Sequence, residues 1–184
     1  MPSHLTRRSI LGSGAAIAVV GVTAAEAAAE EVISDPLGAT REMAVRFDLK
    51  QWDRLVQVFT TEVHVDYTGL VGGEPATVPA ATLVGDWRRN LGHLSATQHM
   101  LANQAVRVTG REAGATADFQ ATHRSGPLVG GRLWVLGGRY DYRLTRVGGG
   151  WRINSVTMHP LWEHGDRTII GLPAGGRRRR ATAR

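Results

Sequence analysis

Cysteine is absent from the 184 residues of this chain, which excludes disulfide bonds, thiolate nucleophiles and cysteine-based zinc sites. Aromatic residues are few, at 6%. No apolar run reaches the roughly 18 to 20 residues that a membrane-spanning helix needs. Acidic residues are almost missing from the two ends of the chain, where seven arginines lie beside the single acid Glu26.

The net charge of +6 therefore comes from the ends, because residues 30–176 hold 15 basic and 15 acidic side chains. Because the central part is neutral, the net positive charge gives no reason to propose a nucleic-acid partner, and we expect none. With 42% hydrophobic residues, this part is long enough for one globular domain.

The N-terminus resembles a twin-arginine export signal. Arg7 and Arg8 precede a weakly apolar stretch at 12–25, and small residues follow up to Ala29. We expect a signal over residues 1–29 that is cleaved between about Glu26 and Glu31, which places the mature protein in the periplasm or outside the cell. The alternative is an uncleaved anchor, for which the apolar stretch is short.

The C-terminal segment 171–184 holds glycines and a run of four arginines, and from Gly175 onward it has only small alanines to pack. Such a composition predicts a solvated, disordered tail. A weak contact with anionic lipid or nucleic acid is the alternative.

Helical patterns dominate the first half of the remaining chain, 30–170. Asp35 followed by Pro36 is a helix start, and apolar residues then recur at helical spacing up to Phe47. Further patterns predict a short helix over 51–59, a strand over 63–67, a loop over 69–79 and a helix over 80–91.

The second half reads as four strands joined by glycine-rich turns, at 97–108, 115–123, 133–147 and 151–159. Short turns between long strands predict an antiparallel meander. The fold class is therefore α+β, with a curved antiparallel sheet wrapped around the N-terminal helices as a cone. Small-molecule sites favour the open mouth of such a cone.

Five short motifs occur in an order that resembles the SnoaL-like branch of the nuclear transport factor 2-like superfamily, and within it the scytalone dehydratases. They are Phe47-Asp48-Leu49-Lys50-Gln51-Trp52-Asp53-Arg54-Leu55, Val65-Asp66-Tyr67, Thr97-Gln98-His99, Gly138-Arg139-Tyr140 and Gly149-Gly150-Trp151-Arg152-Ile153. The resemblance covers roughly Asp35 to Arg167. It implies an α+β barrel that forms dimers or trimers and a cofactor-free acid–base reaction on a hydroxylated cyclic ketone or polyketide-like substrate.

The same resemblance assigns the catalytic roles to Asp48, His99 and Tyr67. Three positions depart from the pattern of the dehydratases. Phe47 replaces a tyrosine, Phe119 replaces a second cavity histidine, and Tyr140 replaces an asparagine. His123 lies four residues after Phe119 on the same face of its strand.

The residues themselves support this chemistry. An acid such as Asp48 on an otherwise apolar helix end is costly to bury unless it is paired. If it meets His99, it fixes the imidazole tautomer, and the ring can act as general base and then general acid. The Tyr67 hydroxyl can polarise a carbonyl. The structural alternatives are a helix-end acid with local hydrogen bonds, a satisfied core histidine and a packed tyrosine.

The expected substrate-binding residues share the inner faces of the strands or lie beside Asp48: Phe47, Asn103, Phe119, His123, Trp134 and Tyr140. His159 and His164 are five residues apart, a spacing that does not favour a metal site, so we predict none. Two function classes remain open. One is a cofactor-free lyase or isomerase, and the other is a non-catalytic module that binds a small molecule.

Overall fold

The computed structural model describes residues 32–171. Helices, including one-turn helices η2 and η3, are α1 (Pro36–Asp48), α2 (Trp52–Val56), α3 (Thr68–Val71), α4 (Ala80–Leu91), η2 (Pro127–Val129) and η3 (Arg167–Ile169). The strands are β1 (Phe59–Asp66), β2 (Ala76–Pro79), β3 (Ala96–Thr109), β4 (Glu112–Arg124), β5 (Leu133–Val147) and β6 (Gly150–Gly165). Within this range no helix is long and apolar enough to cross a membrane.

Helix α1 begins where its capping residues predict. The Asp35 carboxylate accepts a hydrogen bond from the Gly38 N–H (2.7 Å), and Pro36 occupies the first helical position. Its buried residues include Ala39, Met43 and Phe47, which recur every three or four positions and so form one stripe. This stripe turns the last residues of the helix, and with them Asp48, toward the sheet.

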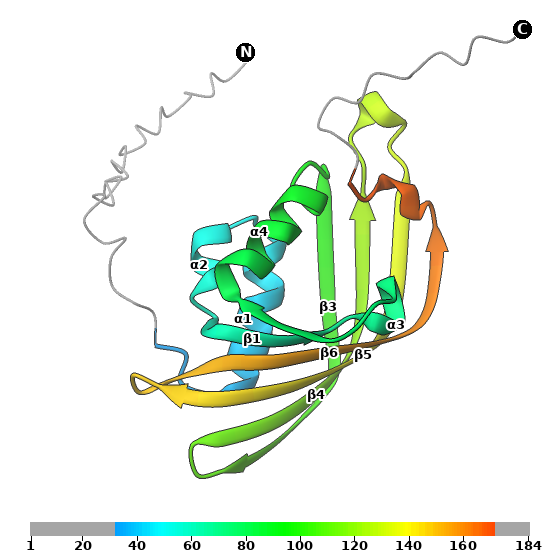
Figure 1. The fold of residues 1–184 in the computed structure, drawn as a ribbon. Helices are drawn as coiled ribbons and strands as arrows, with labels where there is room; N and C mark the ends of the chain where they lie inside the picture. The colour runs from blue at the N-terminus through cyan, green and yellow to red at the C-terminus, as the bar shows by residue number, and fades with distance from the viewer. Residues whose placement is uncertain (1–31, 172–184) are drawn as a thin grey trace, which may run out of the picture. The chain divides into compact units, whose positions relative to one another are not determined.

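The six strands form one sheet in the order β2-β1-β6-β5-β4-β3 (Figure 1). Strands β3 to β6 are the expected antiparallel meander. The pair β1–β6 is parallel, so the sheet is mixed at this one point. The predicted α+β class, with a curved sheet and N-terminal helices, is confirmed.

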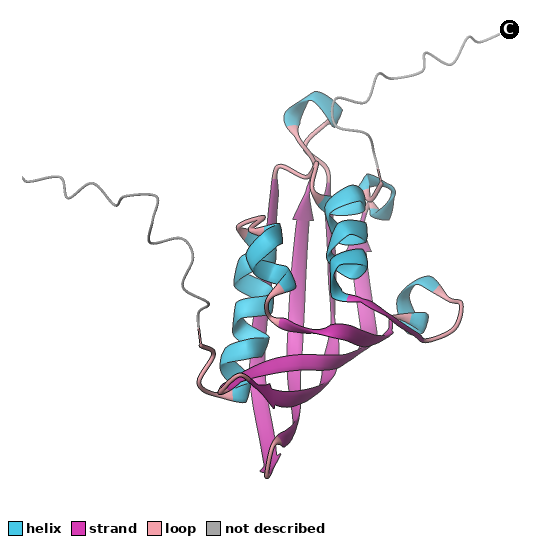
Figure 2. Cartoon of the chain, turned by 60° about the vertical axis from the view of Figure 1, so that its left-hand side comes forward, coloured by secondary structure: helices cyan, strands magenta, loops and turns pink. Residues whose placement is uncertain are grey.

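Helices α1, α2 and α4 lie against the same face of the curved sheet (Figure 2). The inner faces of β4 and β5 alternate with exposed or half-buried positions, and their inward residues are almost completely buried. Opposite Gly137 and Gly138 of β5, strand β6 carries a bulge at Leu161, which has no partner between Pro160 and Trp162. A Cβ atom on Gly138 would overlap the His159 carbonyl, so only glycine allows the two strands to approach there.

The segment 69–79, predicted to be a loop, instead contains most of α3 and the whole of β2, which pairs antiparallel with β1. This strand is exposed and only four residues long, so it has no buried alternation to reveal it. Strand β6 also runs six residues beyond the predicted end at His159. The expected export signal and nearly all of the expected tail lie outside the described residues.

Candidate functional site

The end of α1 is tied to the loop that precedes β3. Lys50 adopts a left-handed conformation (φ 55°), which turns the chain after the helix. Its ammonium donates hydrogen bonds to the carbonyl oxygens of Gly92 (3.1 Å) and Leu94. This tie places Asp48, the last residue of α1, beside the first residues of β3.

Asp48 and His99 form the closest polar contact of the site. The His99 ring donates from Nδ1 to Asp48 Oδ1 (2.7 Å), and the His99 backbone N–H donates to Oδ2 (2.7 Å). Both carboxylate oxygens are therefore engaged by one residue. Because an ionised carboxylate only accepts hydrogen bonds, the proton of a neutral His99 ring lies on Nδ1, and Nε2 is left free for another partner.

The charge state of Asp48 follows from two opposed effects. Burial raises its pKa, whereas the hydrogen bonds and the charge of His99 lower it, and the net pKa lies below the ordinary value of 3.8. The group is thus a carboxylate at neutral pH. The side chains of His99 and Asp48 are 12% and 20% exposed, so the pair is shielded but not sealed from water.

Aromatic rings hold the His99 imidazole from the side. Phe47 meets the imidazole edge to face, with ring centroids 4.8 Å apart. Phe47 is itself packed edge to face against Trp52 (5.5 Å) and Trp87 (5.7 Å). With Nδ1 bonded and one face packed, the orientation of the His99 ring is fixed before any ligand arrives.

His99 lines a cavity of about 350 Å³ enclosed between the helices and the sheet. The lining is mainly apolar and aromatic, and among the described residues that line it there is no lysine or arginine. The expected residues Phe47, Tyr67, His123, Trp134 and Tyr140 all contribute to it. A neutral, mostly apolar molecule suits this lining.

His123 lies beside His99 inside the cavity, with ring centroids 5.6 Å apart. It is 3% exposed, and its Nδ1 has no hydrogen-bond partner among the described residues. Burial, with the charge of His99 as a second cause, lowers the pKa of His123 to about 4. This histidine is therefore neutral at pH 7 and able to donate a hydrogen bond to a ligand.

Two tyrosine hydroxyls also face the cavity, whose other polar lining residues are Asp86 and Asn90 of α4. Tyr67 follows the last residue of β1 and stacks on Trp87, and Tyr140 lies on the inner face of β5. Burial raises the pKa of both phenols, with Tyr140 as a second cause for Tyr67. Both hydroxyls keep their protons at neutral pH, so they are hydrogen-bond donors rather than bases.

The structure places two of the expected substrate-binding residues outside the cavity lining. Asn103 is exposed and donates to Asp118 Oδ2 (2.7 Å), because a bulge between Ala102 and Ala105 reverses the alternation of β3. Phe119 is buried but does not line the cavity, since it stacks behind Tyr140 with centroids 4.2 Å apart.

Sequence reasoning missed several lining residues as site residues. Leu83, Trp87 and Leu91 belong to the apolar stripe that predicts α4, and this stripe faces the cavity. Leu70 on α3 and Ile170 after η3 also line it. No pattern marks these last two, because neither belongs to a long periodic segment.

The two histidines considered for a metal site are separated by the sheet register. His159 bonds through Nε2 to Asp141 Oδ2 (2.9 Å) on the exposed face of the sheet, whereas His164 pairs with Val135. Across residues 32–171 no group of three or more metal-ligating side chains comes together.

Comparisons with known proteins agree with this architecture. A family model described as a SnoaL-like domain matches residues 39–157. The Kfla4162 protein from Kribbella flavida is 26% identical, with a TM-score of 0.66 over 70% of this chain and 89% of its own. A proposed aromatic ring hydroxylase from Novosphingobium aromaticivorans is 24% identical, with a TM-score of 0.63 over 72% and 92%.

A third solved structure is a proposed scytalone dehydratase, also from Novosphingobium aromaticivorans. It is 17% identical, with a TM-score of 0.57 over 68% of this chain and 81% of its own, so the likeness is one of fold. No protein with a curated description matches the chain. The matched range holds both Asp48 and His99 and ends before the last eight residues of β6.

Proposed function

The chain belongs to the SnoaL-like domain family, and from that premise we propose that it is a cofactor-free acid–base enzyme for a small, neutral cyclic hydroxy-ketone or polyketide-like substrate. The observation that carries the proposal is His99, which lines an apolar cavity while its Nδ1 is hydrogen-bonded to Asp48. The reaction is elimination of water, or isomerisation or cyclisation by the same proton transfers.

The elimination is redox-neutral. His99 Nε2 takes a proton from the carbon between the ketone and the hydroxyl-bearing carbon, and Asp48 stabilises the imidazolium that forms. Tyr67 donates a hydrogen bond to the ketone oxygen as its charge grows. The enolate then re-forms the carbonyl, a carbon–carbon double bond forms, and the C–O bond breaks. The proton on His99 passes to the leaving hydroxide, and water is released.

The test uses two racemic probes, 3-hydroxycyclohexanone and 3-hydroxy-1-tetralone. Loss of water from them gives cyclohexenone and 1-naphthol, which ultraviolet absorbance and fluorescence detect. The expected result is turnover above the uncatalysed rate by wild-type protein and loss of it in Asp48→Asn. Asp141→Asn, which alters an exposed aspartate hydrogen-bonded to a histidine, is the matched control. Equal rates for the wild-type protein and Asp48→Asn would overturn the mechanism.

A second candidate function is that of a binding module without catalysis. The aromatic side chains Phe47, Trp87, Trp134 and Tyr140 line much of the cavity and favour stacking on a bound ring. In this case ligand affinity is unchanged by Asp48→Asn, and no probe is converted by the wild-type protein. Mass spectrometry of ligands that co-purify with the wild-type protein tests the candidate directly.

We also propose that the protein assembles as a homo-oligomer through the outer face of the sheet. This face exposes large apolar side chains, including Met100 and Trp162, each 48% exposed. Light scattering at tens of micromolar is expected to give a dimer or trimer mass. A strictly monomeric mass would contradict the proposal.

Export by the twin-arginine route is proposed from residues 1–29. Replacing Arg7 and Arg8 by lysine is expected to leave the folded protein in the cytoplasm. N-terminal sequencing of the exported wild-type protein is expected to give a mature chain that begins between about Glu26 and Glu31. Material that begins at Met1 or Pro2 would contradict cleavage.

A further inference from the structure

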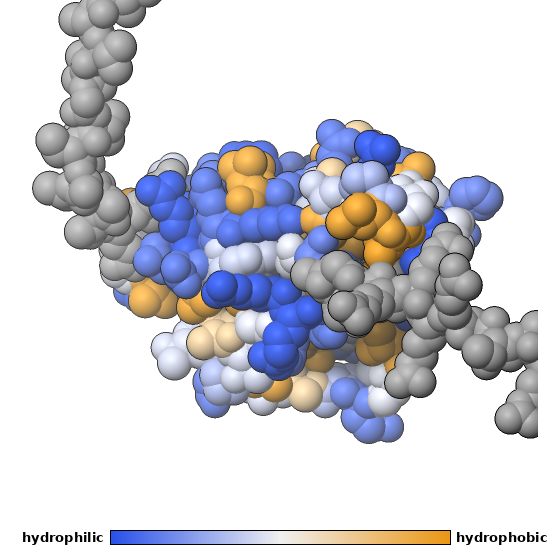
Figure 3. All heavy atoms as spheres, turned by 90° about the horizontal axis from the view of Figure 1, so that it is seen from above, coloured by the Kyte–Doolittle hydropathy of each residue, from blue (hydrophilic) through white to orange (hydrophobic). Residues whose placement is uncertain are grey.

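The mouth of the cavity is closed in part by a segment that the family match does not include. Residues 166–171, here called the strap, follow β6 and contain η3, whereas the match ends at residue 157. Figure 1 shows this segment in orange-red at the end of the sheet where β5 begins. Viewed from this end, apolar patches lie among hydrophilic side chains (Figure 3).

Two neighbouring isoleucines give the strap its two contacts with the interior. Ile169 is fully buried in the core, and Ile170 lines the cavity together with Leu70 and Val71 of α3. Val71 is 70% exposed, which places this group at the rim. The strap therefore has an anchor in the core and one side chain at the entrance.

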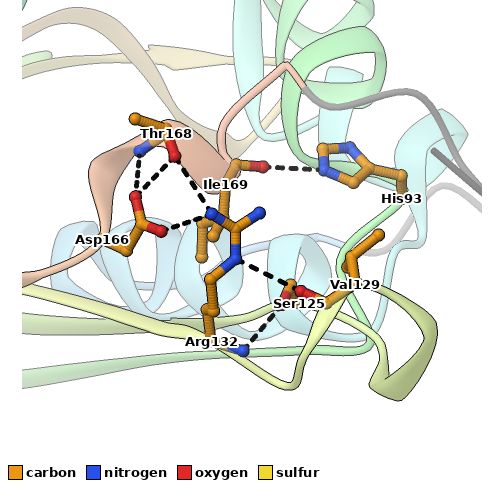
Figure 4. A network of polar contacts seen from close by, with 7 residues as sticks. All are labelled: His93, Ser125, Val129, Arg132, Asp166, Thr168 and Ile169. Carbon is orange, nitrogen blue, oxygen red and sulfur yellow. Dashed lines mark hydrogen bonds and ion pairs between the residues drawn. The ribbon is translucent and has the colours of Figure 1, made fainter. Parts of the chain in front are cut away.

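Polar contacts fix the strap to three neighbouring segments, and Figure 4 shows those made by Arg132 and His93. Arg132, after η2, bonds to Asp166 and to Thr168 (3.2 Å). The His93 ring donates from Nε2 to the Ile169 carbonyl (2.9 Å). The Arg167 guanidinium donates to the Leu70 carbonyl.

Two further bonds hold the ends of the strap. The Asp166 N–H donates to the Leu133 carbonyl (2.7 Å), and the Gly171 N–H donates to the Asn90 carbonyl (2.9 Å). The strap is thus bound at both ends and in the middle. The position of Ile170 is set by these bonds rather than by its own packing alone.

We propose that the strap determines which ring systems the cavity accepts, with Ile170 as the specificity-determining residue and Arg132 as a positioning residue. The proposal rests on the proposed function, because it concerns the substrate of that same site. A side chain at the entrance discriminates by size, and one extra or missing apolar group in a pocket changes selectivity about tenfold or more. The substrate range is then a property of this chain rather than of the matched family domain.

The experiment measures binding by equilibrium dialysis, so it does not depend on turnover. The probes are three neutral ketones of increasing size: cyclohexanone, 1-tetralone and 9-fluorenone. Ile170→Ala is expected to raise the affinity for 9-fluorenone relative to cyclohexanone about tenfold, and Ile170→Trp to lower it by a similar factor. Leu161→Ala is the matched control, because Leu161 is 76% exposed and outside the lining.

Arg132 is tested by its effect on the same affinity ratio. Arg132→Ala is expected to shift the ratio in the direction of Ile170→Ala, and Arg132→Lys, which keeps the cation, to restore most of the wild-type ratio. A merely structural role would lower the affinity for all three ketones equally. Wild-type ratios in both Ile170 variants, folded by circular dichroism, would overturn the inference. A wild-type protein that binds none of the ketones would overturn the proposed function and this inference with it.

Discussion

Two Asp–His pairs lie on opposite sides of the sheet. They consist of the same residue types but differ in their exposure to water and in their hydrogen bonds. Asp48 and His99 join α1 to β3 at 2.7 Å, and their side chains are 20% and 12% exposed. Asp141 and His159 join β5 to β6 at 2.9 Å, and both are 50% exposed. The first pair has a second hydrogen bond, from the His99 backbone to the carboxylate.

The difference shows what converts an ion pair into a candidate catalytic group. The exposed pair is screened by water and contributes little. The inner pair is held by a backbone N–H, and its histidine packs against Phe47 and lines the cavity. Fixed orientation and restricted water make a general base effective, and residue type alone supplies neither.

The largest expected effect separates the two histidines. His99→Ala is expected to lower the turnover number about 10²–10⁴-fold, because it removes the proposed general acid–base group. His159→Ala is the control and is expected to leave turnover unchanged. Initial rates with 3-hydroxy-1-tetralone measure both. Comparable losses of turnover in the two variants would show that a position in the cavity does not decide which histidine takes part in the reaction.

The two aspartates provide the second comparison. Asp48→Asn is expected to remove most of the activity, and the double variant with His99→Ala is expected to be no worse than either single variant, since the residues act as a unit. Asp141→Asn is expected to retain wild-type rates. Additive losses in the double variant would mean that Asp48 and His99 act independently.

Tyr67→Phe sharpens the comparison by removing a single hydroxyl while the inner pair stays intact. The expected loss in turnover is smaller than that of His99→Ala and at most about 10²–10³-fold, the range for one oxyanion donor. Steady-state rates with both hydroxy-ketones measure it. A loss in turnover greater than that of His99→Ala would contradict the proposal that His99 is the main catalytic group and Tyr67 a hydrogen-bond donor that assists it.

His123, beside the inner pair, predicts a pH dependence of stability. Its pKa is about 4 in the folded protein, against an ordinary value of 6.5. The unfolded chain therefore binds more protons between these values, so the free energy of unfolding falls as the pH drops from about 6.5 to 4. The shift corresponds to roughly 3 kcal/mol.

Urea unfolding of wild type and His123→Gln at pH 7 and pH 4.5 measures this effect. The variant is expected to lose less stability on acidification than the wild type does. His159→Gln is the control and is expected to behave like the wild type. An unchanged pH dependence in His123→Gln would mean that another group carries it.

The smallest effect belongs to the exposed pair itself. Breaking it with Asp141→Ala is expected to change the free energy of unfolding by about 0–1 kcal/mol, as for surface ion pairs in general. Urea unfolding at low and high salt measures the change, which is expected to shrink as salt screens the charges. A loss of several kcal/mol would contradict the exposed character of this pair.

Local signals in the sequence predict much of the fold. Asp35 and Pro36 mark the start of α1, and the range 80–91 predicts α4 with its observed bounds. The family prediction is confirmed by the match over residues 39–157. Local patterns cannot reveal pairing between distant segments, so the sequence does not predict the parallel pair β1–β6. Strand β2 escapes prediction for another reason, because it is short and exposed and has no buried alternation.

Which strand residues line the cavity can be predicted from the sequence only where inward and outward side chains alternate regularly. Tyr140 and Trp134 lie on an uninterrupted inner face of β5 and line the cavity as expected. Asn103 lies within a bulge, which turns its side chain to the other face, and no sequence pattern predicts that bulge. Ile170 reaches the cavity through contacts made after β6, so its role depends on tertiary structure alone.

The parallel pair β1–β6 has a consequence for how the chain folds. It joins Phe59 to Ile153 and Asp66 to Thr157, segments about ninety residues apart. The sheet order places β1 between β2 and β6, so β1 gains its second neighbour only after nearly the whole domain has been synthesised. Contacts of such high sequence separation slow folding. We therefore expect the domain to complete its sheet after translation, with β6 as the strand that closes it.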